Sequence, residues 1–451
     1  MINLLFNSDL KTFSMGGLHV PDNKLSDKEA IKHIPIPKEV HVPFAQHIGS
    51  PSEPIVQKGD KVKTGQLIAK STGPISANIH SPVTGMVLKL DKFLDTSGYK
   101  KPSIVIKAES DNWIESVNLD ESLDTEIKLE KEEILDRIRE YGIVGLGGAT
   151  FPAHAKLGSK NDTRKPELLL INGVECEPYL TADHRLMLEK ADQIIVGVNI
   201  LQKALRIKKA YIGIENNKRD AIEIMRKAAK PYGYIEIIAL KVKYPQGGEK
   251  QLIKAVTGRE VPSGKFPLDI GDIVYNVGTV YAIYEAIQKN KPLIQRVVTV
   301  TGKSLERPSN FWVRIGTPIQ HLLDQVGGIP EDTGKIINGG PMMGKAVKDF
   351  TIPVTKGTSG ILILQHDHSY KKEIKPCIRC SKCIDVCPMG LEPFLFMNLT
   401  EKLFFERLEH ESVADCIECG SCSYICPSGR PLLDYIRWGK TAVRKMKIKQ
   451  N

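Results

Sequence analysis

The sequence predicts a multidomain protein of the mixed α/β class, and three observations support this. A chain of 451 residues is long enough for roughly three or four domains that each bury a core. Short β-type segments separated by Gly and Pro fill the first 110 residues, and strand and helix patterns alternate between residues 125 and 290. Eight of the nine cysteines lie between residues 377 and 426, which indicates a separate cysteine-rich unit.

The composition is typical of a soluble globular protein, with 41% hydrophobic and 26% charged residues. We find no apolar run long enough to span a bilayer, and residues 1–9 lack the features of a signal peptide. Clustered cysteines without an export signal predict a reducing cytoplasm. Aromatic residues make up only 6% of the chain and no basic–aromatic motif occurs, so we expect no binding of nucleic acid.

The cysteines form one motif written twice. The pattern Cys-x2-Cys-x2-Cys-x3-Cys-Pro covers residues 377–388 and again 416–427. Three thiolates of such a run hold three corners of an iron–sulfur cube, and the fourth binds the other cube. This predicts one [4Fe–4S] cluster on Cys377, Cys380, Cys383 and Cys426. It predicts a second on Cys416, Cys419, Cys422 and Cys387.

Zinc and disulfides are the alternatives for these cysteines. Zinc sites usually combine two separated Cys-x2-Cys pairs, not an unbroken triple with a trailing Cys-Pro. Disulfides do not fit a long chain without a secretory signal. The pattern therefore favours two adjacent clusters, and a chain that carries them transfers electrons.

The N-terminal segment predicts a small β-sandwich or barrel, with strands over residues 39–43, 66–70, 85–90 and 103–107. The phrase at 56–87 resembles the biotinyl- and lipoyl-type hammerhead domains, in which a lysine at a hairpin tip carries the prosthetic group. The tip here, 71–78, has no lysine, so we expect a packing or docking module. The segment 16–21 and His80 are interpreted as structural and not as metal ligands.

The middle segment follows βαβ logic. A helical stretch at 129–141 leads into the Gly-rich loop 142–156, where glycines admit a phosphate close to the backbone and Lys156 adds a point charge. An apolar run at 168–171 predicts a buried parallel strand, and ligands bind at the carboxyl ends of such strands. Two further loops, at 244–253 and 274–280, complete the candidate site.

The Gly-rich loop, the turn at 172–178 that follows the predicted strand and the two further loops, in this order, resemble the flavin-binding subunit of respiratory complex I. With the hammerhead-like start and the twin cysteine runs, nearly the whole chain is similar to one family, the C subunit of the Rnf-type ferredoxin:NAD+ oxidoreductase. The resemblance implies a hammerhead (barrel-sandwich hybrid) domain, a Rossmann-like FMN-binding α/β domain, a β-grasp (soluble-ligand-binding) domain and an α-helical two-cluster ferredoxin domain. The expected boundaries are 1–115, 116–292, 293–368 and 369–438, with a basic tail at 439–451.

The resemblance also implies which residues surround the cofactors. FMN, bound non-covalently, is expected against Gly145, Gly147 and Gly148. Its phosphate is expected to pair with Lys156, and its remaining contacts are Asn172 and Asn276. Glu175 and Glu177 are expected to face the nicotinamide nucleotide. Residues expected to border both ligands are Tyr244, Gly247 and Glu249.

The chain departs from the complex I pattern at four positions. Arg, Asp, Glu and Asn of that pattern are replaced by Leu146, Val174, Gly248 and Tyr275. Each replacement loses a polar contact, so the affinity for FMN or dinucleotide is expected to differ. Cys176 stands where complex I has Ser, and we expect a packed side chain whose flanking carboxylates raise its pKa, not a redox thiol.

The last third of the chain carries three further expectations. Residues 296–365 return to β character, and Met342 and Met343 are expected to pack against a neighbouring domain. The spacing of apolar residues predicts a helical face between 391 and 411. The basic tail from Lys440 could dock on anionic lipid or an acidic partner, but its composition favours a solvated, disordered terminus.

The resemblance finally implies a function. The chain would be a peripheral subunit on the cytoplasmic face of a membrane, bound to the other Rnf subunits, exchanging electrons with NAD(H) directly and with ferredoxin indirectly, coupled to Na+ or H+ transport. A flavin links two-electron hydride transfer to one-electron clusters, and direct hydride transfer needs no acid–base residue, so no catalytic residue is assigned. The alternatives are a soluble reductase for another acceptor, such as a cobalamin reductase or proline-reductase electron donor, and a non-catalytic scaffold.

Overall fold

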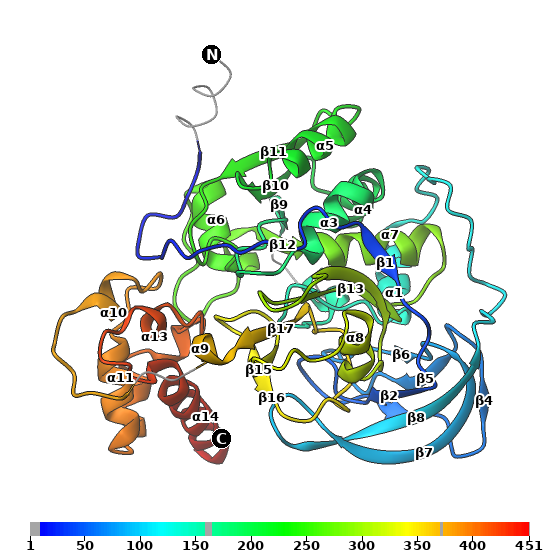
Figure 1. Ribbon diagram of the computed structural model, residues 1–451. Coiled ribbons are helices and arrows are strands. Elements are labelled where there is room, and N and C mark those ends of the chain that lie inside the picture. Colours follow the sequence, from blue (N-terminus) through cyan, green and yellow to red (C-terminus); the bar gives the residue numbers. More distant parts are fainter. Residues whose placement is uncertain (1–9, 158–164, 370–372, 451) are drawn as a thin grey trace.

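Four units follow one another along the chain in the computed structural model, which describes residues 10–157, 165–369 and 373–450 (Figure 1). A β unit, an α/β unit, a mixed β unit and a helical unit succeed each other, and no helix among the described residues is long and apolar enough to cross a membrane. The architecture is mixed α/β, as predicted.

The first unit consists of two small antiparallel sheets, with strand orders β2-β8-β7-β4 and β3-β5-β6. Val40 and Ile104 from one sheet and Ile68 from the other share one buried core. Each predicted strand is present. The bounds are β2 (Glu39–Pro43), β3 (Glu53–Pro54), β4 (Lys61–Val62), β5 (Leu67–Lys70), β6 (Ile79–His80), β7 (Thr84–Leu94) and β8 (Lys100–Ser110).

The second unit is built on a parallel four-stranded sheet with the order β11-β10-β9-β12. Because side chains alternate along a strand, Leu169 and Ile171 face one core while Leu170 faces the other. The first core is shared with α1, α3, α4, α5 and α7, and the second with α6, so both faces of the sheet are covered.

The elements of this unit match the predicted βαβ pattern. After β9 the chain forms two successive helices that are separated at Lys190. The bounds are α1 (Lys131–Glu140), α2 (Ala153–Lys156), β9 (Leu168–Asn172), α3 (Ala182–Glu189), α4 (Ala191–Leu205), β10 (Ala210–Glu215), α5 (Arg219–Ala229), β11 (Ile235–Leu240), α6 (Glu249–Thr257), η1 (Pro267–Ile270), β12 (Asp272–Asn276) and α7 (Val277–Gln288).

The third unit is a mixed six-stranded sheet with the order β1-β14-β13-β17-β15-β16, packed against α8. Its edge strand β1 comes from the N-terminal segment and pairs in parallel with β14. The bounds are β1 (Ile31–His33), β13 (Gln295–Thr301), β14 (Ser309–Arg314), α8 (Ile319–Gln325), β15 (Thr333–Asn338), β16 (Lys345–Val347), β17 (Gly360–Gln365) and α9 (His366–Ser369).

The fourth unit is helical and holds both cysteine runs. The helical face predicted between 391 and 411 is not continuous: the chain breaks at Leu403, which has a φ of +60°, and both Leu403 and Phe404 are exposed. The bounds are α10 (Lys382–Asp385), α11 (Pro393–Glu401), α12 (Phe405–His410), η2 (Val413–Asp415), α13 (Ser421–Ile425) and α14 (Leu432–Gln450).

The expectation of a disordered basic tail is wrong. Helix α14 continues through residues 439–450, and Val443 on it is buried in the core of the helical unit. Lys440 is only 19% exposed, and its ammonium donates hydrogen bonds to Cys416 O at 2.7 Å and Glu418 Oε1 at 2.8 Å. The first residues of the tail therefore belong to the cysteine-rich unit.

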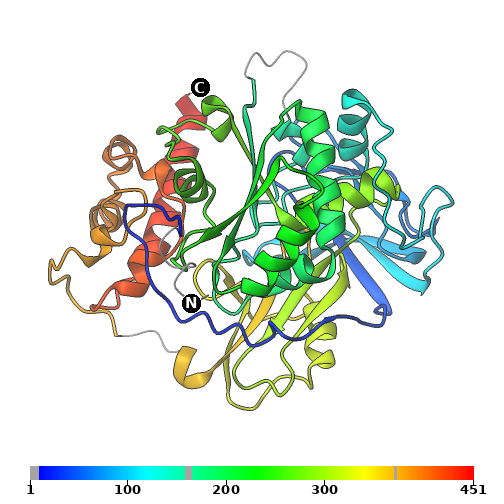
Figure 2. The same cartoon turned by 90° about the horizontal axis from the view of Figure 1, so that it is seen from above.

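Residues 10–30, which we call the N-terminal strap, run along the α/β unit and reach the helical unit before entering β1 (Figure 2). Leu18 and Tyr244 exchange two backbone hydrogen bonds of 2.7 Å, and Gly17 N donates to Val386 O at 3.0 Å. The partly buried Lys24 donates from its ammonium to the carbonyls of Glu175, Glu177 and Leu180. The strap thus ties the α/β unit to both later units.

Candidate cofactor sites

The carboxyl ends of β9 and β12 form the centre of the first candidate site. These neighbouring strands place Asn172 and Asn276 opposite each other in the parallel register. From β9 the chain continues to β10 and β11 on one side and returns to β12 on the other, so the order of the strands reverses at this point. Open α/β sheets bind ligands in the crevice at such a switch point.

The Gly-rich loop lies over this crevice. A Cβ atom on Gly147 would lie 3.3 Å from Cβ of Asn276, so the loop backbone packs directly on that side chain. Gly148 has a φ of +110° and would meet nothing within 4 Å, which leaves open space beside it. The hydrogen bond from Gly145 N to Phe151 O closes the loop at 2.8 Å.

Both asparagine side chains are held in place by protein groups. Asn172 Nδ2 donates to Gly247 O at 2.8 Å. Asn276 Oδ1 accepts from Gly278 N at 2.9 Å and so caps helix α7, while Asn276 Nδ2 donates to Asp183 Oδ2 at 2.6 Å. Their orientation at the strand ends is therefore fixed.

Asp183 is a member of this site that the motifs did not indicate. Burial, followed by the nearby charge of Glu175, raises the pKa of Asp183 to about 7. The buried guanidinium of Arg296 lies close enough to act on Asp183, and burial lowers the pKa of Arg296 to about 10. Neither residue stands in a glycine-rich or motif-like stretch, so only the perturbed environment reveals them.

Lys156 lies at the rim of the site on the short helix α2. Its ammonium is 2.7 Å from Glu249 Oε1 and donates a second hydrogen bond of 3.0 Å to Val274 O. Both side chains of the ion pair remain partly exposed, at 31% and 41%. The structure therefore brings Lys156 and Glu249 together beside β12.

The two glutamates expected to face a nucleotide are both engaged by the protein. Glu175 accepts hydrogen bonds from the backbone of Asp183 at 2.8 Å and His184 at 3.0 Å, at the start of α3.

Glu177 points toward the third unit. Its Oε1 accepts from the backbone of Met342 at 2.7 Å and Met343 at 3.0 Å. Burial raises its pKa. Met342 is close to Gly420, but the side chain of Met343 is 46% exposed, so the expected packing does not hold for Met343.

Cys176 is packed beneath the loop at 244–248, as expected. Gly247 N donates to its sulfur at 3.3 Å, and a Cβ atom on Gly247 would lie 3.1 Å from that sulfur. Burial, followed by the charge of Glu215, raises the pKa of the Cys176 thiol. Its neighbourhood therefore keeps the thiol protonated.

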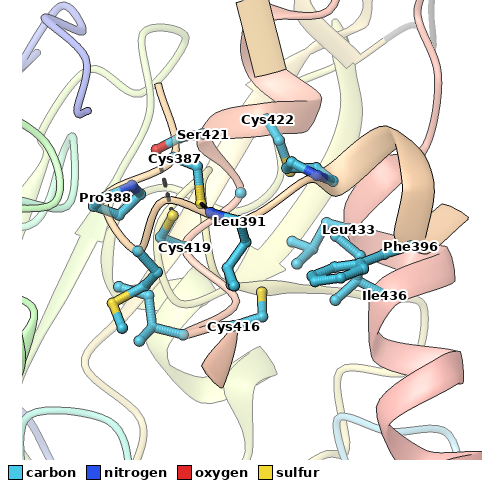
Figure 3. Close-up of a pocket in the computed structure, with 14 residues that line it drawn as sticks. Cys387, Pro388, Leu391, Phe396, Cys416, Cys419, Ser421, Cys422, Leu433 and Ile436 are labelled. Carbon is cyan, nitrogen blue, oxygen red and sulfur yellow. Dashed lines mark hydrogen bonds between the residues drawn. The ribbon is translucent and has the colours of Figure 1, made fainter. Parts of the chain in front are cut away.

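The second candidate site is a cavity in the helical unit (Figure 3). Four cysteines line it: Cys387, Cys416, Cys419 and Cys422. Apolar side chains such as Phe396 and Ile436 close its walls. Backbone N–H groups of Leu391 and Glu418 donate to the sulfurs of Cys387 and Cys416, each at 3.4 Å.

The thiols of this cavity are spread around its wall. Among the described residues, no three Cys, His, Asp or Glu side chains converge closely enough to hold a single metal ion. In a zinc site every sulfur lies about 2.3 Å from the metal. The trailing Cys387 of the first run lines this cavity together with the three cysteines Cys416, Cys419 and Cys422 of the second.

The other four cysteines lie nearer the surface. Cys377 and Cys380 are exposed, whereas Cys383 and Cys426 are partly buried. Burial raises the pKa of Cys383, and the thiols of Cys426 and Cys377 raise it further because they lie close by. The trailing cysteine of the second run is thus placed next to the first run.

Side-chain hydrogen bonds join the two candidate sites. Tyr244 Oη donates to Cys419 O at 2.7 Å, and Glu177 Oε2 lies 3.3 Å from the same hydroxyl. Gln251 Nε2, on helix α6, donates to Pro388 O at 3.3 Å. The cavity therefore abuts the loop and helix that border the strand ends.

Four family models match the chain in succession. They are the RnfC barrel sandwich hybrid domain (residues 11–111), the Nuo51 FMN-binding domain (138–285), the SLBB domain (297–346) and the 4Fe–4S dicluster domain (369–427). The matches support an FMN site in the α/β unit and iron–sulfur binding in the helical unit.

Full-length relatives decide the family. The C subunit of the proton-translocating ferredoxin:NAD(+) oxidoreductase complex of Clostridium ljungdahlii is 46% identical over 96% of this chain and 94% of the relative. The C subunit of the Na(+)-translocating complex of Acetobacterium woodii is 41% identical over 97% and 98%. The chain belongs to the RnfC family.

The fold of this RnfC chain is similar to that of a chain of NAD+-reducing [NiFe]-hydrogenase. A chain of that enzyme, solved in the H2-reduced state, aligns with a TM-score of 0.50 over 68% of the RnfC chain and 61% of its own length, at 18% identity. The air-oxidised state gives 0.51 over 70% and 63%, at 16% identity. At these identities the likeness concerns the fold.

The residues of this RnfC chain fit both cofactors. For FMN, the Gly-rich loop packs on Asn276 at the end of β12, the space beside Gly148 is open, and Lys156 supplies a partly exposed cation. For a cluster, four thiols share one apolar-walled cavity.

The four residues that depart from the complex I pattern pack inside this RnfC chain. Leu146, Val174 and Tyr275 are buried, and Tyr275 Oη donates to Ala153 O at 2.7 Å. A Cβ atom on Gly248 would lie 2.4 Å from Gln251 Oε1. The lost polar groups are therefore replaced by packing under the site.

Proposed function

We propose that this chain is the peripheral electron-transfer subunit of an ion-translocating ferredoxin:NAD+ oxidoreductase complex, on the cytoplasmic face of the membrane. Near-full-length similarity to the C subunits of two such complexes carries the proposal. In this function the chain exchanges hydride with NAD(H) and passes single electrons to or from the other subunits, which connect it to ferredoxin and to Na+ or H+ transport.

The finer assignments belong to the same proposal. The units correspond to the hammerhead, Rossmann-like, β-grasp and α-helical ferredoxin folds, with boundaries near residues 115, 292 and 368. The cluster ligands are the two cysteine sets predicted from the sequence, with one [4Fe–4S] cluster on each. The residues that surround FMN and NAD(H) are Gly145, Gly147, Gly148, Lys156, Asn172, Glu175, Glu177, Tyr244, Gly247, Glu249 and Asn276.

Each part of the chain has a role in this function. Bound flavin supplies the conversion between a two-electron hydride and single electrons, which clusters carry one at a time. Asn172 and Asn276 orient the ligand, because protein hydrogen bonds already hold both amides. Lys156 holds its phosphate, and Glu175 and Glu177 act by keeping the neighbouring loops in position.

The positions of the cysteines support an order of electron transfer. Cys419, in the cavity, contacts Tyr244 of the α/β unit, so the cluster of the cavity is the nearer one to the flavin. Cys377 and Cys380 are exposed at the surface, so the other cluster faces another protein of the complex. Electrons would pass between flavin and that protein through these two clusters in turn.

The test is anaerobic purification followed by reduction. We expect flavin that acid releases, about eight iron atoms per chain, and bleaching of the flavin absorbance by NADH. Flavin and clusters that stay oxidised in excess NADH would overturn the proposal. Co-purification with integral membrane proteins from native membranes separates a component of a membrane complex from a soluble reductase, and the relatives favour the former.

A further inference from the structure

The cluster cavity is held from outside at two places on its wall. One is Cys419, whose carbonyl accepts from Tyr244. The other is the segment 386–388, which the N-terminal strap and helix α6 contact. Cys419 and Cys387, one in each segment, line the cavity. Tyr244 and helix α6 belong to the α/β unit, and the strap runs along that unit.

Hydrogen bonds hold both the backbone and the hydroxyl of Tyr244. It is 2% exposed, and its backbone N–H and carbonyl both bond to Leu18 of the strap at 2.7 Å. Its hydroxyl is 2.7 Å from Cys419 O, while Glu177 Oε2 lies farther away at 3.3 Å.

The strap contacts the opposite segment through glycines. Gly16 has a φ of +63°, and a Cβ atom there would lie 2.5 Å from both C and O of Cys387. Gly17 N donates to Val386 O at 3.0 Å. Only a residue without a side chain permits this close approach, so the strap rests on the backbone of a cavity cysteine.

We propose that Tyr244, held by the N-terminal strap, is a positioning residue that fixes the cluster of the cavity relative to the flavin. This rests on the proposed function, because it takes the cavity as a cluster site and the α/β unit as a flavin site. The strap supports the backbone of Tyr244, and the hydroxyl fixes the carbonyl of Cys419. The rate of electron transfer falls steeply with distance, so this contact sets how fast the two centres exchange electrons.

The test compares Tyr244→Phe with Tyr234→Phe in the complete, cofactor-loaded chain. Tyr234 is on the same unit but is 47% exposed, so it controls for the loss of a hydroxyl. In anaerobic stopped flow with NADH, we expect flavin bleaching to precede reduction of the clusters. We expect Tyr244→Phe to slow the second phase at least fivefold and the first phase much less. We expect Tyr234→Phe to leave both within about twofold of the unsubstituted chain.

Electron paramagnetic resonance of dithionite-reduced protein gives a readout without NADH. We expect Tyr244→Phe to change the signal of one cluster and not the other. The proposal is overturned if Tyr244→Phe changes neither the spectra nor the rate of cluster reduction. It is also overturned if the substitution slows only flavin bleaching, or slows flavin bleaching and cluster reduction equally. If NADH reduces nothing in the unsubstituted chain, the proposed function fails, while the dithionite spectra still test the contact of Tyr244.

Discussion

The ammonium of Lys156 forms an ion pair with the carboxylate of Glu249, at 2.7 Å, beside the carboxyl end of β12. The two residues are 93 positions apart and come from the Gly-rich loop region and the start of helix α6. Both remain partly exposed, so an anionic ligand can compete with Glu249 for the lysine.

Removal of Lys156 should weaken FMN binding. A charge-assisted hydrogen bond contributes about 1.5–3 kcal/mol, so we expect Lys156→Ala to raise the Kd for FMN at least about tenfold. Glu249→Gln should lower the Kd, because it removes a competing negative charge. Quenching of flavin fluorescence measures both, with the exposed Lys128→Ala as control. Equal affinity in all variants would exclude Lys156 as the phosphate ligand.

Cys387 should be a ligand of the cluster that the second cysteine run holds. It lines the same cavity as Cys416, Cys419 and Cys422. We expect Cys387→Ser to lower the iron content from about eight to about four atoms per chain and to remove one cubane signal. Cys176→Ser, outside both sets, should keep all iron. A variant of Cys387 that loses the cluster of the exposed cysteines would show ligation within one run.

Gly16→Ala tests the strap against a matched glycine. Gly16 and Gly59 both have positive φ values, +63° and +92°, but a Cβ atom on Gly59 would meet nothing within 4 Å. Both substitutions incur backbone strain, and only Gly16→Ala also collides with the backbone of Cys387. We expect Gly16→Ala to be less stable than Gly59→Ala by about 1–3 kcal/mol in thermal unfolding. Equal stability would show that the strap adapts without cost.

Lys356 should make stability depend on pH. It is buried, donates to Asn78 O and Gly142 O, and burial lowers its pKa from 10.5 to about 7. Above pH 7 the unfolded chain binds a proton that the native chain has released. The unfolding free energy therefore rises with pH, by at most about 1.4 kcal/mol per unit.

The measurement is denaturant unfolding at pH 7, 8 and 9. Lys356→Met should reduce the rise without abolishing it, because burial lowers the pKa of Lys24 to about 8 and this group adds a rise of the same sign. The exposed Lys348→Met should keep the full rise. His80 does not interfere, because its pKa is lowered to about 3 and its contribution changes only below pH 6.5. The same slope in both variants would contradict the assignment.

Loss of Lys440 should speed the release of iron from the cavity, whereas loss of an exposed lysine on α14 should not. It bonds to Cys416 O and Glu418, whereas Lys447 is 55% exposed and bonds to Glu409. A hydrogen bond from a charged donor contributes about 1.5–3 kcal/mol, so we expect Lys440→Met to lose iron to a chelator about tenfold faster. Lys447→Met should differ by less than twofold. Equal rates would mean that Lys440 does not support the loop.

Local patterns predicted much of the fold, because they reflect local causes. The apolar run at 168–171 became a strand buried on both faces, and the cysteine spacing indicated the helical unit. The continuous helical face predicted between 391 and 411 was wrong at Leu403. This residue has a positive φ at the break between two helices, and its apolar side chain lies outside the core. The basic composition of the last residues concealed Val443, whose buried side chain joins Leu432 and Ile436 in anchoring helix α14.

The missing parts of the site depend on contacts between distant residues. Asp183 acts through Asn276, and Glu177 bonds to the backbone of Met342, more than ninety residues away in each case. No short motif encodes such pairs. The homologous pattern placed Glu177 beside a nucleotide, but only the packed chain shows the backbone donors that already engage its carboxylate.

The strap also constrains how the molecule can be made. Residues 10–30 leave the ribosome long before the residues they contact, because Leu18 bonds to Tyr244 and Gly16 packs on the segment at Cys387. Domains generally fold as units in the order of synthesis. The strap therefore stays undocked until its partners near residues 244 and 387 have emerged, and its docking is a late step of assembly.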